Sequence, residues 1–109
     1  MVLIRRLQLR TDEGIVDVLV SITDPVEVRG SWFSTYEVAW PDGTARDDIW
    51  GADAIQALYL TMQALALAIY ASAHHQSGRL YWQELGAGYG LPMPKAGRSA
   101  LVGRDRDDY

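Results

Sequence analysis

The segment from Asp53 to His75 constrains the fold of this chain more than any other part of the sequence. It is rich in alanine and leucine, which are strong helix formers, and it is apolar around most of its circumference, so it predicts one long helix. Asp53 can cap the helix start, with Gln56 three residues later as in a capping box, and Ser77-Gly78 supplies a stop. One side has the i, i+3, i+4, i+7 spacing of a core-facing stripe. This stripe comprises Ile55, Leu58, Met62, Leu65, Ala66, Ile69 and Ala73.

The opposite flank of this helix is also apolar, and a single sheet cannot cover both sides. An exposed apolar patch of that size usually marks an interaction site, so a symmetric partner is one interpretation. In the alternative, the chain's own tail folds back over the flank, using Leu91, Met93, Leu101 and Val102. The sequence leaves both interpretations open. The candidate interface consists of Ala57, Leu60, Ala64, Leu67, Ala68 and Ala71.

The first half of the chain predicts antiparallel strands joined by short turns. Gly14 ends the first turn, Pro41–Thr44 forms another, and Asp24-Pro25 ends the second strand because proline cannot donate a hydrogen bond to a strand ladder. We therefore expect an α+β domain, with a four-stranded antiparallel sheet and one long helix packed on one face. Residues 79–84 are either a fifth strand, which the alternation favours, or a short helical extension. The four expected strands are residues 2–10, 15–23, 32–40 and 45–50.

The composition changes at residue 86, where glycine and proline become frequent. We accordingly expect a single domain over residues 1–85, followed by a Gly/Pro-rich tail, residues 86–109. Composition alone is typical of a flexible tail. We expect this one to pack on the body of the domain or on a neighbour.

Charge and composition argue against several functional classes. The net charge of −4 disfavours nucleic-acid binding, and the lack of cysteine excludes disulfides and thiolate metal sites. The N-terminal residues lack the apolar region of a signal peptide, and the most apolar stretch, residues 64–73, is too short to span a bilayer. We expect a cytoplasmic, bacterial-type protein that binds no cofactor, metal, nucleic acid or membrane.

The polar residues do not form a recognisable catalytic or metal-binding motif. Residues 86–90, GAGYG, resemble a phosphate loop only faintly, because the Lys-Ser/Thr of a P-loop is missing. His74 and His75 point about 100° apart on a helix, so they cannot chelate one metal ion, and they suit a solvated helix end. The acids around the fourth strand are expected to be solvated turn and edge residues, because Asp47 and Asp48 face opposite sides of it. These acids are Asp42, Asp47, Asp48 and Asp53.

Aromatic residues line one face of the third strand, which carries Trp32, Tyr36 and Trp40. We expect this face to lie in the core, because the opposite face carries Thr35 and Glu37. An exposed aromatic platform for a protein partner is the alternative.

The start of the helix carries a family resemblance. Residues 50–58, WGADAIQAL, followed by a long alanine-leucine helix, resemble a family of small bacterial proteins known only as a domain of unknown function, with a G-x-D-A-x-Q-A-L helix start. The resemblance extends over residues 32–84 and does not include the Gly-rich tail. It implies a few antiparallel strands, a helix and a short Trp-containing segment, and no activity. The matching residues are Gly51, Asp53, Gln56, Ala57, Leu58 and Trp82.

Two functional hypotheses follow from these patterns. The first is a non-enzymatic module, of an immunity or regulatory type, that binds a protein partner or forms a homodimer through the candidate interface. The second is a small-ligand binder or minor enzyme with a pocket between sheet and helix. Such a pocket requires converging polar groups such as Gln63, Tyr59 or Glu37 beside Trp and Tyr side chains.

Overall fold

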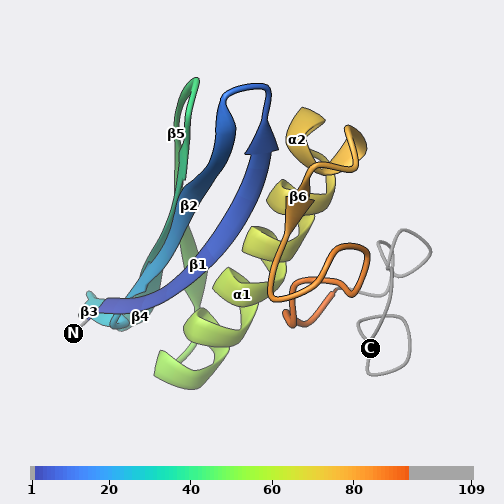
Figure 1. Ribbon diagram of the computed structural model, residues 1–109. Coiled ribbons are helices and arrows are strands. Elements are labelled where there is room, and N and C mark those ends of the chain that lie inside the picture. Colours follow the sequence, from blue (N-terminus) through green and yellow to red (C-terminus); the bar gives the residue numbers. More distant parts are fainter. Residues whose placement is uncertain (1, 94–109) are drawn as a thin grey trace.

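A computed structural model describes residues 2–93 of the chain, and these form one sheet with two helices and a C-terminal segment on the same side of it (Figure 1). The architecture is α+β with an antiparallel sheet, as the sequence predicts. No helix within residues 2–93 is long and apolar enough to cross a bilayer. The elements are β1 (Val2–Thr11), β2 (Gly14–Thr23), β3 (Val26–Val28), β4 (Ser31–Trp40), β5 (Gly43–Gly51), α1 (Ala54–Tyr70), α2 (Ala73–Gln76) and β6 (Leu80–Tyr81).

The sheet has six strands, and β4 organises it. One edge of β4 pairs with β5 along its whole length, from Trp32↔Gly51 to Trp40↔Gly43. The other edge pairs first with β3 and then with β2, and β1 and β6 follow beyond β2. The hairpins between β1 and β2 and between β4 and β5 lie where the sequence predicts them.

The sequence prediction of four or five strands is too low, because two strands are very short. β3 has three residues and β6 has two, and neither length is enough to display period-two alternation. The preference for a strand over residues 79–84 is correct for Leu80 and Tyr81, which pair with Leu9 and Gln8 of β1.

The gap between β2 and β3 falls at Asp24-Pro25, the predicted end of the second strand. Proline has no backbone N–H, so the ladder with β4 is interrupted there. Side chains make up for the lost bonds. The Ser34 hydroxyl donates to the Thr23 carbonyl over 2.6 Å, and the Thr35 N–H donates to Thr23 Oγ1 over 3.0 Å. β2 and β3 therefore lie along the same edge of β4 as one bent strand.

The helix starts as the sequence predicts and ends earlier. The Asp53 side chain accepts from the Gln56 N–H over 2.8 Å, and the Gln56 side chain accepts from the Ala52 N–H over 2.6 Å. The prediction of one helix through His75 is wrong, because α1 ends at Tyr70. Ser72 then has extended backbone angles and caps a separate short helix, α2, by accepting from the His75 N–H.

Helix α1 is also rotated relative to the predicted stripe. It packs over β4 and β5, and the side chains that face the sheet have a spacing of four: Ala57, Thr61, Leu65 and Ile69. Thr61 can be buried because its hydroxyl donates to the Ala57 carbonyl over 2.6 Å. Of the predicted core stripe, Leu65, Ala66 and Ile69 are buried and Leu58 and Met62 are half-buried, whereas Ile55 is 81% exposed and Ala73 is exposed.

A second element, together with α1, covers the inner face of β1 and β2. Residues 89–93, here called the strap, run beside α1 on the same side of the sheet (Figure 1). Tyr89, Leu91 and Met93 of the strap are buried in the core. These side chains share one cluster with Leu7 and Val18 of the sheet. Leu91 lines a cavity with Met62, Leu65 and Ile69, on the predicted core side of the helix, so the tail residues Leu91 and Met93 join the core and are not shown to cover the opposite flank. The other two residues proposed for that role, Leu101 and Val102, lie outside the described residues.

Candidate functional site

The outer face of the sheet lies on the side away from α1 (Figure 1). It carries seven of the exposed large hydrophobic side chains of residues 2–93. Strand registers place alternate residues of the four long strands on this face, and Ile4 is 65% exposed there. Large apolar side chains that lie exposed on one face can mark an interaction site on a soluble protein. The exposed aliphatic and aromatic residues of this face are Val2, Ile4, Ile15, Leu19, Val26, Val28 and Trp50.

An aromatic pair lies at one end of the outer face. Phe33 of β4 is opposite Val26 of β3 on one side and Trp50 of β5 on the other. The ring centroids of Phe33 and Trp50 are 4.8 Å apart, and Trp50 is 50% exposed. A tryptophan held by a neighbouring ring and half open to solvent has the size and rigidity of the anchors that dominate protein interfaces.

The charges on the outer face balance. Arg46 is opposite Glu37, and Arg6 lies 3.6 Å from Asp17. The Thr35 hydroxyl donates to Asp48 over 2.6 Å. The face therefore carries no net charge although the chain carries −4. Its charged residues are Arg6, Arg10, Arg46, Asp17, Glu37 and Asp48.

The six residues of the candidate interface on the helix occupy different environments. Ala57 is fully buried against the sheet, so it belongs to the core and is not available to a partner. Leu67 is 43% exposed and Ala71 is exposed. The remaining three, Leu60, Ala64 and Ala68, are half-buried.

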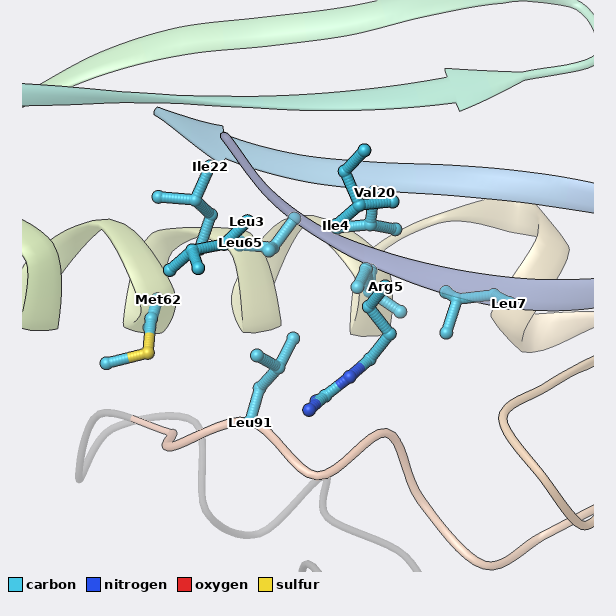
Figure 2. Close-up of a pocket in the computed structure, with 10 residues that line it drawn as sticks. Leu3, Ile4, Arg5, Leu7, Val20, Ile22, Met62, Leu65 and Leu91 are labelled. Atoms are coloured by element: carbon cyan, nitrogen blue, oxygen red, sulfur yellow. The ribbon is translucent and has the colours of Figure 1, made fainter. Parts of the chain in front are cut away.

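A cavity of about 130 Å³ lies between the inner face of β1 and β2, helix α1 and the strap (Figure 2). Its walls are aliphatic except for Arg5 and the thioether of Met62. The polar groups expected to converge on a sheet–helix pocket, Gln63, Tyr59 and Glu37, do not line it. The hollow therefore lacks the Trp and Tyr side chains and the converging polar groups that the second hypothesis requires.

Arg5 connects this cavity wall to the strap. It lies on the inner face of β1, the same face as Leu7. One of its guanidinium nitrogens donates to the carbonyls of Tyr89 and Gly90 over 2.8 and 3.1 Å. The guanidinium carbon lies 4.0 Å from the centroid of the Trp82 ring. In the sequence, Arg5 alternates with Leu3, Leu7 and Leu9 along one strand face. An arginine between inward leucines was the available signal.

A second hollow, of about 290 Å³, lies where α2, β6 and residues 84–89 meet. Nδ1 of His75 lies 2.6 Å from the hydroxyl oxygen of Tyr89, and that hydroxyl also donates to the Leu80 carbonyl over 3.4 Å. The His75 ring packs edge-on against Tyr70. Partial burial lowers the pKa of His75 below its ordinary value, so the neutral imidazole is the form that the fold favours.

This pKa shift predicts a pH dependence of stability. The unfolded chain takes up a proton on His75 near pH 6.5, before the folded chain does, so stability is highest above that pH and falls as the pH drops through it. We expect the urea midpoint to decrease from pH 7.5 to pH 5.5, and His75→Gln to reduce this decrease. A variant that keeps the full decrease would contradict this assignment.

The other histidine and the acidic residues considered as metal or catalytic candidates do not gather at one site. His74 lies 2.9 Å from Asp42 and stacks on Trp40, so the two histidines contact different elements. The hydrogen bond from His74 lowers the pKa of the exposed Asp42 carboxyl. Asp47 and Asp48 face opposite sides of β5, as expected. Within residues 2–93, no three His, Asp or Glu side chains converge as a metal site would require.

The aromatic face of β4 is mainly in the core, as the sequence predicts. Tyr36 and Trp40 pack against the buried cluster, and Trp32 is half-buried. Burial, and secondarily the charge of Asp47, raises the pKa of the Tyr36 hydroxyl. The faint phosphate-loop segment instead forms the turn that leads into the strap, with positive φ at Gly86, Gly88 and Gly90.

A scan against protein-family models matches residues 3–93 to a domain of unknown function, DUF6968. The chain belongs to this family. The match covers every described strand and helix of the fold, and it extends through the strap to Met93. The resemblance seen in the sequence, over residues 32–84, therefore lies inside a longer DUF6968 domain that includes the β1–β2 hairpin. No curated protein and no solved structure matches this DUF6968 domain.

Proposed function

We propose that this DUF6968 domain is a non-enzymatic binding module that forms a homodimer through the outer face of its sheet. The observation that carries the proposal is the uncovered apolar face with the Phe33–Trp50 pair at one end. Two such faces can pack as the sheets of a sandwich do, about 10 Å apart. The lack of cysteine is compatible with a cytoplasmic location, which we propose as well.

A second copy of the chain fits this face better than a charged partner does. The face carries equal numbers of positive and negative side chains, so it does not repel a copy of itself, whereas the rest of the chain holds the net negative charge. The two long hairpins, β1–β2 and β4–β5, each expose two strands of about ten residues, or roughly 300 Å² per hairpin, and they join through the pairing of β2 with β4. With side-chain relief, the accessible area approaches the roughly 800 Å² per partner of a standard interface.

The test is the mass in solution across a concentration series, measured by sedimentation velocity. We expect a dimer for the unmodified chain, and Trp50→Asp to weaken it at least about 30-fold, which corresponds to roughly 2 kcal/mol lost at an interface anchor. The half-exposed position of Trp50 on an edge strand leaves the core intact. Circular dichroism checks that the variant is folded.

The matched control is Leu67→Asp, which places the same charge on the exposed flank of α1. It should leave the dimer unchanged. If Leu67→Asp or Leu60→Asp dissociates the dimer and Trp50→Asp does not, the interface lies on the helix, as the sequence analysis proposed. A chain that is monomeric at the highest concentrations would contradict dimerisation through either surface.

A further inference from the structure

Strand β5 lies at an edge of the sheet and, within residues 2–93, pairs only with β4 (Figure 1). It has nine residues and no proline, so its free edge can accept a further strand. The Asp48 N–H points away from β4, because it donates to the Asp47 carboxylate over 2.9 Å. Since the direction of these groups alternates along a strand, the N–H and C=O groups of Thr44, Arg46, Asp48 and Trp50 all point away from β4.

An apolar flank of α1 lies beside this edge. Helix α1 packs over β4 and β5 in about equal measure, and Met62 and Ile69 face the cavity beneath the strap. At about 100° per residue, Leu60, Ala64 and Leu67 fall on the opposite flank of the helix. This flank therefore faces the side on which β5 has its free edge. Leu67 is 43% exposed there, and Leu60 and Ala64 are half-buried.

The sequence of β5 is complementary to itself in one antiparallel register. When Asp47, the central residue, lies on a two-fold axis, all nine residues of β5 pair with those of a second copy. Arg46 of each copy then faces Asp48 of the other, and opposite charges on facing residues stabilise a strand pair. An axis at Arg46 or at Asp48 would instead place two like charges opposite each other. Charge therefore selects the register centred on Asp47.

The same register brings the two α1 helices to the distance at which helices pack. Paired strands lie about 4.8 Å apart, so two helices that each lie over β4 and β5 have axes about 10 Å apart across the two-fold axis. Packed helices have interaxial distances of roughly 8–10 Å. Small side chains such as Ala64 suit this approach, and Leu60 and Leu67 supply the apolar area.

We propose that the free edge of β5 and the adjacent flank of α1 form an interface with a second copy of the chain, with the two β5 strands antiparallel about a two-fold axis at Asp47. This interface does not depend on dimerisation through the outer face of the sheet. If both interfaces form, the chain assembles into a tetramer or a larger species.

Asp47 limits the strength of this interface. The two Asp47 carboxylates face each other across the axis, and like charges on facing residues destabilise a strand pair. Each carboxylate also accepts from the Asp48 N–H of its own chain, which must be released before that N–H can bond to a second copy. We therefore expect the edge to associate more weakly than the outer face, at concentrations above those at which the outer-face dimer is complete.

The first test is sedimentation velocity of the full chain across a concentration series. Thr44→Pro removes an N–H that points away from β4, so it spares the β4 ladder and should weaken association through the edge at least about tenfold. The matched control, Thr44→Ala, keeps this N–H and should not weaken it. Leu67→Asp should weaken the same step while it leaves the outer-face dimer intact.

A second variant tests the register itself. Asp47→Asn removes the facing charges and keeps the shape of the side chain, so it should strengthen the edge step about two- to fivefold. Amide hydrogen exchange then locates the contact. Protection of the Arg46 and Asp48 amides should rise with protein concentration, whereas the Ala45 and Ile49 amides, which point toward β4, should be protected at every concentration.

Leu19→Asp separates the two interfaces, because Leu19 is 42% exposed on the outer face of β2, away from the β5 edge. A dimer that Thr44→Pro dissociates and Leu19→Asp does not would support the edge and contradict the outer-face proposal. Association that is insensitive to Thr44→Pro and to Leu67→Asp would overturn the edge interface and leave the outer face untouched. An edge step that Asp47→Asn does not strengthen, or Arg46 and Asp48 amides whose protection ignores concentration, would overturn it as well.

Discussion

A chain truncated after Leu85 is expected to lose its folded structure, whereas a chain truncated after Met93 should keep it. The shorter chain lacks Tyr89, Leu91 and Met93, each of which is more than nine-tenths buried. Burial of side chains of this size contributes about 1.5–3 kcal/mol each. Their summed loss, roughly 4.5–9 kcal/mol, is comparable to the whole free energy of unfolding of a small domain, about 5–15 kcal/mol.

Urea unfolding followed by far-ultraviolet circular dichroism measures this difference, with the chain of residues 1–93 as the matched control. We expect a cooperative transition for residues 1–93 and none, or one at much lower urea, for residues 1–85. Equal midpoints for the two would show that the strap does not contribute to the core. The result also tests whether the domain ends at residue 85, as composition suggests, or at residue 93, where the family match ends.

The second large effect is expected for Gly51→Ala at the junction of β5 and α1. A Cβ atom at this position would lie 2.5 Å from the backbone nitrogen and 2.8 Å from the Cα atom of Ala57. Both contacts are with helix backbone, which cannot move aside as a flexible side chain does. We expect a loss of about 2–3 kcal/mol in the free energy of unfolding, the usual cost of overpacking.

The control for this variant is Ala39→Val, which adds methyl groups at an exposed position of β4 and should change stability by less than about 0.5 kcal/mol. A Gly51→Ala variant as stable as Ala39→Val would mean that the helix start can shift away from the strand without cost. The close approach also explains the burial of Ala57, because a small side chain is needed where the helix begins against β5.

The parts of the fold that the sequence predicts correctly are those determined by neighbouring residues. The cap at Asp53 depends on a residue three positions away, and the alternation of Val18, Val20 and Ile22 lies within one strand. The turn ending at Gly14 is likewise local. Each of these features is governed by the physics of one element.

The parts that the sequence does not predict depend on contacts between distant segments. The buried face of α1 could not be identified because the helix is apolar on most sides, and its orientation is set by the close approach of Ala57 to Gly51 and by the internal bond of Thr61. The strap has no periodicity, so nothing local marks Leu91 as a core residue. The candidate interface was placed on the helix because the outer face of the sheet becomes continuous only when strands from different parts of the chain lie side by side.

The contact of Arg5 with the Tyr89 and Gly90 carbonyls joins residues that are 84 and 85 positions apart in the chain. During synthesis, the β1–β2 hairpin therefore leaves the ribosome long before the segment that will cover its aliphatic side. Until residues 89–93 have emerged from the ribosome, Leu7 and Val18 are not covered by the strap. The nascent chain then exposes apolar side chains to which chaperones or other chains can bind. We therefore expect the complete core to form only after residues 89–93 have been synthesised, at a rate limited by closure of this long loop.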